Sequence, residues 1–322
     1  MTISAKSILA SQNPDGLRVD TLVLRYPLYI HAQGKTHRLI EIDEAVIALM
    51  NDVSFMDEKE FSRNAQSSRA CGVQRMVNEI LNDTVIPSYW GSKTKSMQAG
   101  EECDNHLTIP HETITTNENK KVIGKEFVGA WEEDVDRETA WLMARNSAIR
   151  FALAFDRAGY HQEIVNRLLI PFIHITTIVT ATEWDNFFNL RIDSDAQHEI
   201  QTLALAIKEA KDNAEVKNLE WGEWHLPFAN EVEIVTPVNQ HLPSLLAIST
   251  ACGARVSFNN LDGTKRTLEK DRGLHDRLLE TRHEKFHASP FEHPCKASKG
   301  KFANFNGFQS YRNHLETNTP IQ

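Results

Sequence analysis

Two segments in the first quarter of the chain are rich in side chains that donate hydrogen bonds to anions. They are residues 33–38 and residues 62–69, which together hold three arginines, three serines, three amides and one histidine. Guanidinium groups bind phosphate oxygens through paired hydrogen bonds, and hydroxyl groups complete such a site. These residues therefore predict a site for a phosphate-bearing ligand. The alternative is a polar surface loop with solvated charges.

Two arginines in the middle of the chain flank an apolar and aromatic stretch. Arg167 stands four residues before Pro171, and the run Asn-Phe-Phe-Asn-Leu-Arg extends from Asn186 to Arg191. Arginines at such positions can bind an anionic ligand, or they can form surface ion pairs beside core phenylalanines. His174 lies in the apolar stretch and is expected to be a core residue.

A third segment combines histidine, serine and proline. Residues 287–293 read His-Ala-Ser-Pro-Phe-Glu-His, and residues 254–258 read Ala-Arg-Val-Ser-Phe. Ser289 followed by Pro290 is typical of a helix start, with the serine as the cap. Because helix N-termini attract anions, such a start can also bind a ligand.

Taken together, these segments resemble the motifs of flavin-dependent thymidylate synthases. The family signature reads Arg-His-Arg, two residues, then Ser-x-Asn-Glu-x-Ser-x-Arg, and residues 36–38 and 62–69 resemble its two halves. Three departures stand out: Thr36 replaces the first arginine, Ala65 replaces the glutamate, and residues 39–61 replace the two-residue gap. This insertion carries seven acidic residues, and we expect it to form a helical flap beside the pocket.

The other segments match further family motifs, in a permuted order. Residues 167–200 resemble Arg-x-x-x-Pro, Asn-Phe-x-x-Leu-Arg and Ala-Gln-x-Glu-Ile, and residues 254–293 resemble Ala-Arg-Val-Ser-Phe and His-x-Thr-Pro-Phe-Glu-His. In the common family pattern, Pro-Phe-Glu-His precedes Arg-His-Arg, whereas here it follows. The chain thus resembles a circularly permuted member of a longer, viral-type branch. Either Arg38 or Arg312 is expected to fill a given phosphate site.

The resemblance implies a reaction, its cofactors and its site residues. The family methylates dUMP to dTMP, with the carbon from methylenetetrahydrofolate and the hydride from FAD that NADPH has reduced. Arg191 is the implied catalytic residue, because a fixed cation near the pyrimidine stabilises developing negative charge. The implied nucleotide-binding residues are Gln33, Ser67, Ser68, Arg69, Arg167 and Arg191. The implied cofactor-binding residues are His37, Arg38, Asn186, His287 and Ser289. Family members are homotetramers whose sites combine several subunits, so a tetramer is expected.

The departures at Thr36 and Ala65 leave other functions open. Loss of a charged hydrogen bond there costs about 1.5–3 kcal/mol, and Ala65 leaves room for the water that a hydroxymethyl product requires. One alternative is hydroxymethylation of dUMP or modification of dCMP. Two others are a non-catalytic nucleotide- or flavin-binding protein and a structural protein with polar surface loops.

The composition favours a globular protein that binds small molecules. Hydrophobic residues make up 41% of the 322 residues and charged residues 25%, which is typical of a packed core. The net charge of −9 argues against a nucleic-acid polymer as partner. Four scattered cysteines show no zinc spacing and no nucleophile setting, which suits flavin chemistry in a reducing cytoplasm. Neither a signal peptide nor an apolar run of about 18 residues is present, so no membrane span is expected.

The elements that must position these residues mix helices and strands. This mixture predicts an α/β or α+β fold. The resemblance implies one thymidylate synthase-like domain over residues 1–322, with a mixed sheet and long helices. Extended structure is expected over residues 19–33, and residues 163–182 are expected to pass from helix to strand. Helical spacing predicts helices over residues 73–81, 127–159, 195–211, 244–251 and 268–282. The polar residues 91–125 predict a long loop.

Overall fold

The structure is a computed structural model that describes residues 3–31, 62–65, 72–95, 99–116, 122–229, 241–255, 267–280, 289–303 and 305–317. The chain groups into two compact units. Unit 1 comprises Gly72–Ile173 together with Met1, and unit 2 comprises Thr2–Cys71 and His174–Gln322. The single domain over residues 1–322 stays a prediction. The acidic insertion, residues 39–61, lies outside the described residues.

Unit 2 is built on a mixed five-stranded sheet with the order β3-β6-β2-β1-β7. Its strands are β1 (Ser4–Gln12), β2 (Arg18–Pro27), β3 (Ser62–Ala65), β6 (His174–Ala181) and β7 (Val216–Asn218). The β1–β2, β2–β6 and β3–β6 pairs are antiparallel, whereas β1 and β7 are parallel. The α+β class and the mixed sheet are therefore confirmed.

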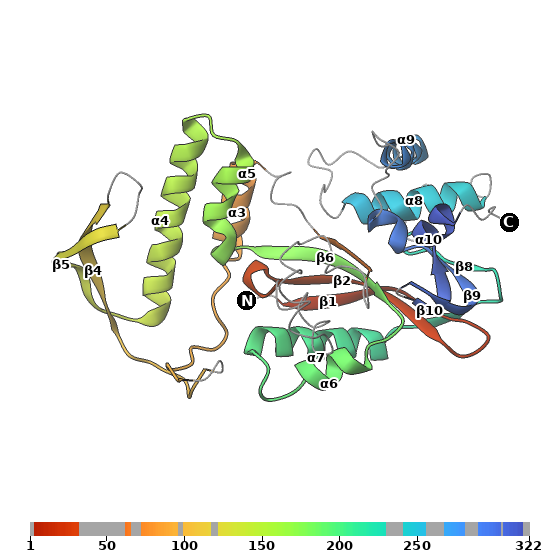
Figure 1. Ribbon diagram of the computed structural model, residues 1–322, viewed down its shortest axis with the longest axis horizontal. Helices are drawn as coiled ribbons and strands as arrows, with labels where there is room; N and C mark the ends of the chain where they lie inside the picture. The colour runs from red at the N-terminus through yellow and green to blue at the C-terminus, as the bar shows by residue number, and fades with distance from the viewer. Residues whose placement is uncertain are drawn as a thin grey trace. The chain divides into compact units, whose positions relative to one another are not determined.

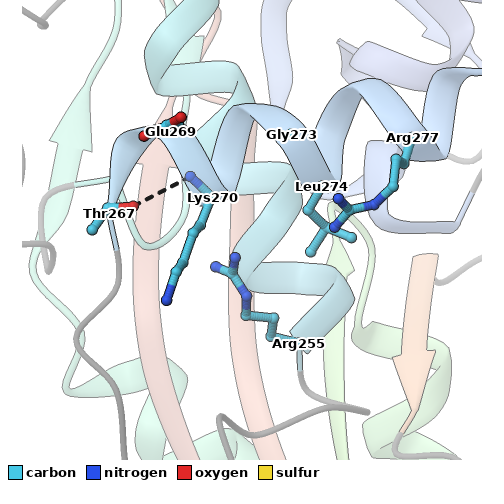
Figure 2. A pocket seen from close by; sticks show the side chains of 7 residues that line it. All are labelled: Arg255, Thr267, Glu269, Lys270, Gly273, Leu274 and Arg277. Carbon is cyan, nitrogen blue, oxygen red and sulfur yellow. Dashed lines mark hydrogen bonds between the residues drawn. The ribbon is translucent and has the colours of Figure 1, made fainter.

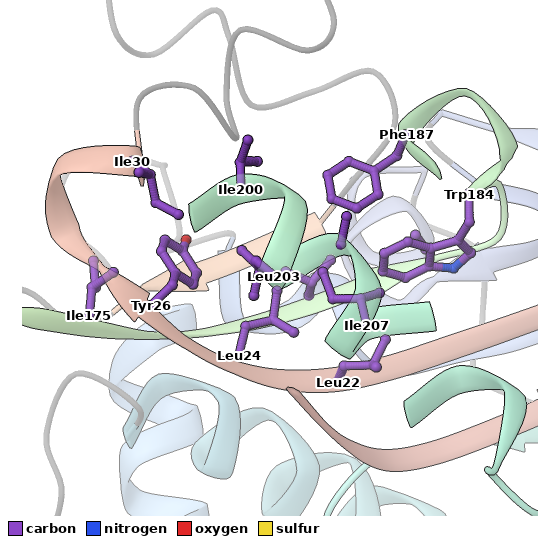
Figure 3. Close-up of a cluster of buried hydrophobic side chains, with 13 residues drawn as sticks. Leu22, Leu24, Tyr26, Ile30, Ile175, Trp184, Phe187, Ile200, Leu203 and Ile207 are labelled. Atoms are coloured by element: carbon purple, nitrogen blue, oxygen red, sulfur yellow. The ribbon is translucent and has the colours of Figure 1, made fainter. Parts of the chain in front are cut away.

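One face of this sheet packs against α6 (Asp185–Arg191) and α7 (His198–Asp212). Side chains alternate along a strand, so every second residue of β2 faces this layer. Figure 3 shows the resulting cluster, in which Leu22 and Leu24 of β2 face Leu203 and Ile207 of α7. Each such buried side chain contributes about 1.5–3 kcal/mol. This layer fixes α6 against the sheet.

The opposite face lies toward α8 (Leu242–Arg255), and α9 (Leu268–Leu279) packs on α8 (Figure 1). The 3-10 turn η5 (Ser289–Glu292) and helix α10 (Tyr311–Glu316) belong to the same layer, next to a three-stranded sheet of β8 (Trp224–His225), β9 (Cys295–Phe302) and β10 (Phe305–Ser310). Gly253 allows α8 to approach η5 closely: a Cβ there would lie 3.2 Å from the ring of His293. A larger residue at this position would push the two segments apart.

Unit 1 consists of helices and a β-hairpin. Its elements are α3 (Val73–Asn82), β4 (Leu107–Thr116), β5 (Val122–Val135), α4 (Arg137–Arg157), α5 (Gln162–Val165) and the 3-10 helix η4 (Asn166–Phe172). Asp136 caps α4 by accepting hydrogen bonds from the backbone N–H groups of Glu138 and Thr139, at 3.1 and 2.9 Å, as an N-cap carboxylate does. The Trp141 ring lies 5.3 Å from that of Phe172 and anchors α4 on η4.

The helix predictions hold where one face of the helix is buried, and two predictions in unit 1 are wrong. Strand β4 lies within the loop predicted over residues 91–125, and β5 replaces the first part of the helix predicted over residues 127–159. Phe127 and Trp131 are four residues apart, a spacing that fits one face of a helix and also one face of a strand. The pairing of β5 with β4 decides between them, and a short sequence window does not contain that information.

Candidate functional site

Some of the predicted site residues lie in the part of the chain that the structure describes, and others lie outside it. Gln33, His37, Arg38, Ser67, Ser68, Arg69 and His287 lie outside the described residues. Arg167 belongs to unit 1, whereas Asn186, Arg191 and Ser289 belong to unit 2. The candidate site in unit 2 therefore comprises these three described residues.

Arg191 is a partly buried cation at the end of α6. Its Nε atom is buried and has no hydrogen-bond partner among the described residues, and no described carboxylate pairs with it. Burial lowers the pKa of its guanidinium group. A buried polar group without a partner costs about 1–3 kcal/mol. Arg191 is thus a donor that a bound ligand would satisfy.

Aromatic packing holds α6, and hence Arg191, in place. Trp184 and Phe187 are buried in the cluster between α6, α7 and the sheet. The Phe188 ring stacks on Trp184 with 5.9 Å between ring centroids. The interpretation of these phenylalanines as core residues is confirmed, and their packing orients the guanidinium.

Asn186 lies on the same helix but on another side. It is exposed, and it makes no hydrogen bond with a described residue. Asn186 stands five positions before Arg191, which corresponds to a rotation of about 140° around an α-helix. The amide is free for a ligand, but it does not share the surroundings of the guanidinium.

Ser289 opens η5, and η5 contacts β3. The structure therefore brings the Ser-Pro-Phe-Glu segment next to residues 62–65 of the split signature, although more than 200 residues separate them in the chain. The helix start predicted at Ser289 is instead a 3-10 turn of four residues, too short for a helix dipole to attract an anion. Ser289 is partly buried and has no hydrogen-bond partner among the described residues.

The five-stranded sheet separates Ser289 from Arg191. On one face, Thr180 Oγ1 lies 2.9 Å from Nδ1 of His293, which follows η5. On the other face, the neighbouring Val179 packs in the cluster that holds α6. Since adjacent residues of a strand point to opposite faces, one chain does not bring Ser289 and Arg191 into one pocket.

Arg167 occupies a different kind of position, in η4 of unit 1. Its side chain is 65% exposed, and its guanidinium lies 3.1 Å from the carboxylate of Glu163 one helical turn earlier. The structure thus shows the surface ion pair that was the alternative for this residue. Such pairs contribute about 0–1 kcal/mol, so an incoming anion could displace Glu163 at little cost.

Arg312 is held by two carboxylates. It donates a hydrogen bond to Glu292 of η5 and another, at 2.8 Å, to Glu316. Burial alone would lower the pKa of this guanidinium, but the hydrogen bonds to Glu316 and Glu292 raise it. Of the two arginines considered for the phosphate, Arg312 is therefore engaged within the protein, and Arg38 lies outside the described residues.

A continuous chain of buried polar groups crosses unit 2, and the sequence did not reveal it. His225 Nδ1 lies 2.8 Å from Ser11 Oγ, and His225 Nε2 lies 2.8 Å from Thr21 Oγ1. Thr21 Oγ1 lies 2.8 Å from Thr180 Oγ1, which bonds to His293. Both histidines are fully buried, and desolvation lowers the pKa of each to about 3. Single histidines in short apolar segments carry no signal of this arrangement.

This chain makes stability depend on pH. In the folded protein His225 and His293 titrate near pH 3, whereas their ordinary pKa is 6.5. Between these values the unfolded state binds more protons, so the free energy of unfolding falls as pH drops from 6.5 toward 3. The expected slope is about 1.4 kcal/mol per pH unit for each histidine. Urea unfolding at several pH values measures it.

A matched pair of variants isolates the buried histidine. His225→Gln is expected to remove one of the two contributions and to flatten the slope. His198→Gln, at an exposed position, is expected to leave the slope unchanged. An equal slope in wild type and His225→Gln would contradict the assignment of the pH dependence to this chain.

Within the described ranges, no three His, Cys, Asp or Glu side chains gather as metal ligands. None of the described helices is long and apolar enough to cross a bilayer.

Comparisons with known proteins find likenesses among solved structures. No protein-family model and no curated protein matches the chain. Among solved structures, the chain is similar to the UMP/dUMP methylase PolB from Streptomyces cacaoi, whose crystal structure contains 5-Br dUMP. The two proteins are 11% identical, with a TM-score of 0.38, over 65% of this chain and 90% of the other. A likeness at this level supports no conclusion about activity.

Proposed function

We propose that the protein is a flavin-dependent thymidylate synthase-like methyltransferase with a permuted motif order. It would convert dUMP to dTMP with methylenetetrahydrofolate, FAD and NADPH. The observation that carries the proposal is the state of Arg191, which ends the Asn-Phe-Phe-Asn-Leu-Arg run. Its guanidinium is partly buried, and its Nε atom has no partner in the described part of the chain. A pyrimidine carbonyl oxygen would satisfy this donor and gain stabilisation as negative charge develops on it.

The described polar residues are compatible with a flavin. Asn186 and Ser289 make no hydrogen bonds with described residues, so their side chains are available to a ligand. We propose that they hold FAD together with His37, Arg38 and His287. A bound flavin supplies hydride-transfer chemistry that protein side chains lack. The remaining nucleotide contacts are assigned to Gln33, Ser67, Ser68, Arg69 and Arg167.

We also propose that the protein forms a homo-oligomer, and the resemblance implies that it is a tetramer. Because the sheet separates Ser289 from Arg191 within one chain, a site that uses both needs a second copy. Unit 1 also exposes large apolar side chains, with Phe151 at 62%, Tyr160 at 53% and Ile164 at 49%. Exposed apolar clusters often mark association surfaces. Light scattering of the purified protein measures the mass, and a monomer would contradict the composite site.

The reaction is tested with dUMP that carries tritium at C5. The expected result is tritium release that requires methylenetetrahydrofolate, NADPH and FAD, with a product of the mass of dTMP. A product heavier by one oxygen, or turnover of dCMP alone, would instead establish the alternative that Thr36 and Ala65 suggest. Absence of tritium release from a protein that binds FAD and dUMP would leave a non-catalytic binding protein.

A further inference from the structure

A basic depression lies where the end of α8 meets α9, in unit 2. Its volume is about 790 Å³, within the range of small-molecule sites. It is lined by Arg255, Thr267, Glu269, Lys270, Gly273, Leu274 and Arg277. In Figure 2, the side chains of Lys270, Arg255 and Arg277 lie on one side of α9, whereas Glu269 points away from them. Three cations thus gather on a protein whose net charge is −9.

Helix periodicity explains this gathering. Lys270, Gly273, Leu274 and Arg277 follow the spacing i, i+3, i+4, i+7, which places them on one face of α9. Thr267 caps the helix by accepting a hydrogen bond from the backbone N–H of Lys270. Arg255, the last residue of α8, reaches the same face from below.

Two of the three cations form no ion pair with a described carboxylate. Arg255 pairs with the fully buried Asp271, but a guanidinium has five N–H donors, so others remain for the depression. Lys270 and Arg277 are exposed, and neither forms an ion pair with a described carboxylate. Like charges in one depression repel each other, and a bound anion removes this cost.

Gly273 lines the depression, and packing between the described elements does not explain why this position is a glycine. A glycine inside a helix costs about 1 kcal/mol relative to alanine. Among the described residues, a Cβ at this position would meet only the Arg277 guanidinium, at 3.9 Å, so no described neighbour requires the glycine. The bare backbone lets a ligand approach α9 closely.

We propose that this depression binds a ligand with two or more adjacent phosphate groups. Lys270 and Arg277 are seven residues apart, about 10 Å along the helix axis, and Arg255 enters beside them. Cations spread over that distance match an extended polyanion better than a single phosphate. The site lies on the α8 face of the sheet, opposite α6 and Arg191, and it does not rest on the proposed methyltransferase function.

The test is calorimetric titration of the full-length protein with sodium pyrophosphate and, separately, with orthophosphate, ADP and citrate. Saturable pyrophosphate binding is expected, at least about tenfold tighter than that of orthophosphate, and weaker as ionic strength rises from about 0.05 to about 0.5 M. ADP binding as tight as that of pyrophosphate would identify a nucleotide as the source of the phosphates. Equal binding of citrate, or no saturable binding of pyrophosphate, would overturn the proposal.

Variants locate the site. The double variant Lys270→Gln/Arg277→Gln is expected to lose at least about tenfold in pyrophosphate affinity, because each charge-assisted contact is worth about a factor of ten or more. Lys208→Gln/Lys301→Gln removes two exposed cations elsewhere and is expected to change affinity little. Arg191→Ala is expected to leave pyrophosphate binding unchanged. Equal losses in the two double variants, or loss of binding in Arg191→Ala, would place the anion elsewhere.

Gly273→Ala gives a readout that does not depend on charge. Alanine favours the helix, so the thermal midpoint is expected to rise. Pyrophosphate affinity is expected to fall several-fold, because the added methyl group occupies the floor. A stabilised variant with wild-type affinity would exclude the helix backbone from the site.

Discussion

Replacement of Arg191 by alanine is expected to lower kcat for dUMP methylation by about 100- to 1000-fold, the usual effect of removing a donor that stabilises a developing oxyanion. The same variant is expected to keep a thermal midpoint close to that of the wild type. The reason is that Nε of Arg191 has no partner among the described residues, so the side chain costs the folded state desolvation that no described hydrogen bond offsets. Loss of activity without loss of stability is the signature of a functional side chain.

The experiment compares kcat, KM and thermal midpoint in three proteins. Arg150→Ala is the matched control, because Arg150 is an exposed arginine on α4. It is expected to match wild type in every measurement. Arg191→Lys keeps the charge but loses the planar donor set, so it should recover only part of kcat. If Arg191→Ala retained wild-type kcat, the residue that carries the proposed function would be wrong.

Replacement of Phe291 by alanine is expected to lower the free energy of unfolding by about 3–5 kcal/mol, the usual cost of removing a buried phenylalanine. Phe291 belongs to the Ser-Pro-Phe-Glu segment that resembles a cofactor-binding motif, yet its side chain is fully buried. Its ring lies 5.6 Å from Tyr311 and 5.4 Å from His275, measured between ring centroids. The truncation therefore leaves a cavity between α8, α9 and α10.

Urea unfolding measures this effect. Leu205→Ala truncates a large apolar side chain at a position that is 49% exposed, and it is expected to change stability by no more than about 0.5 kcal/mol. Phe291→Leu should fall between the two, since it retains part of the buried volume. A loss below about 1 kcal/mol in Phe291→Ala would contradict the packing of η5 described above.

The motif residues Arg191 and Phe291 have two different roles. Nε of Arg191 has no hydrogen-bond partner among the described residues, and the expected contribution of this side chain is to ligand binding. Phe291 is fully buried in a cluster with Trp224, Leu246 and Tyr311, and its expected contribution is to place η5 beside β3. A motif match alone assigns both residues to one site, whereas burial and hydrogen-bond partners divide them into a reactive group and its support.

The sequence alone determined the elements that a short stretch of sequence reveals by its own pattern. Helix α7 was predicted because Ile200, Leu203, Ala204 and Ile207 recur at helical spacing, and the same stripe is buried against the sheet. Helix α9 followed from the same rule, and the passage from helix to strand before Ala181 followed from its β-branched residues. A one-sided pattern suffices here because each helix needs only one apolar face to pack.

Tertiary structure alone decided which partner each polar group received. No spacing in the chain shows that Arg312 meets Glu292, that Asp271 holds Arg255, or that Arg191 meets no described carboxylate. The same is true of the hydrogen-bond chain from Ser11 to His293, whose links join residues at least 100 positions apart. Hydrogen bonds and burial depend on distances between segments that are far apart in sequence. Residue types therefore predicted the kinds of chemistry, and only the fold decided which groups remain free to perform it.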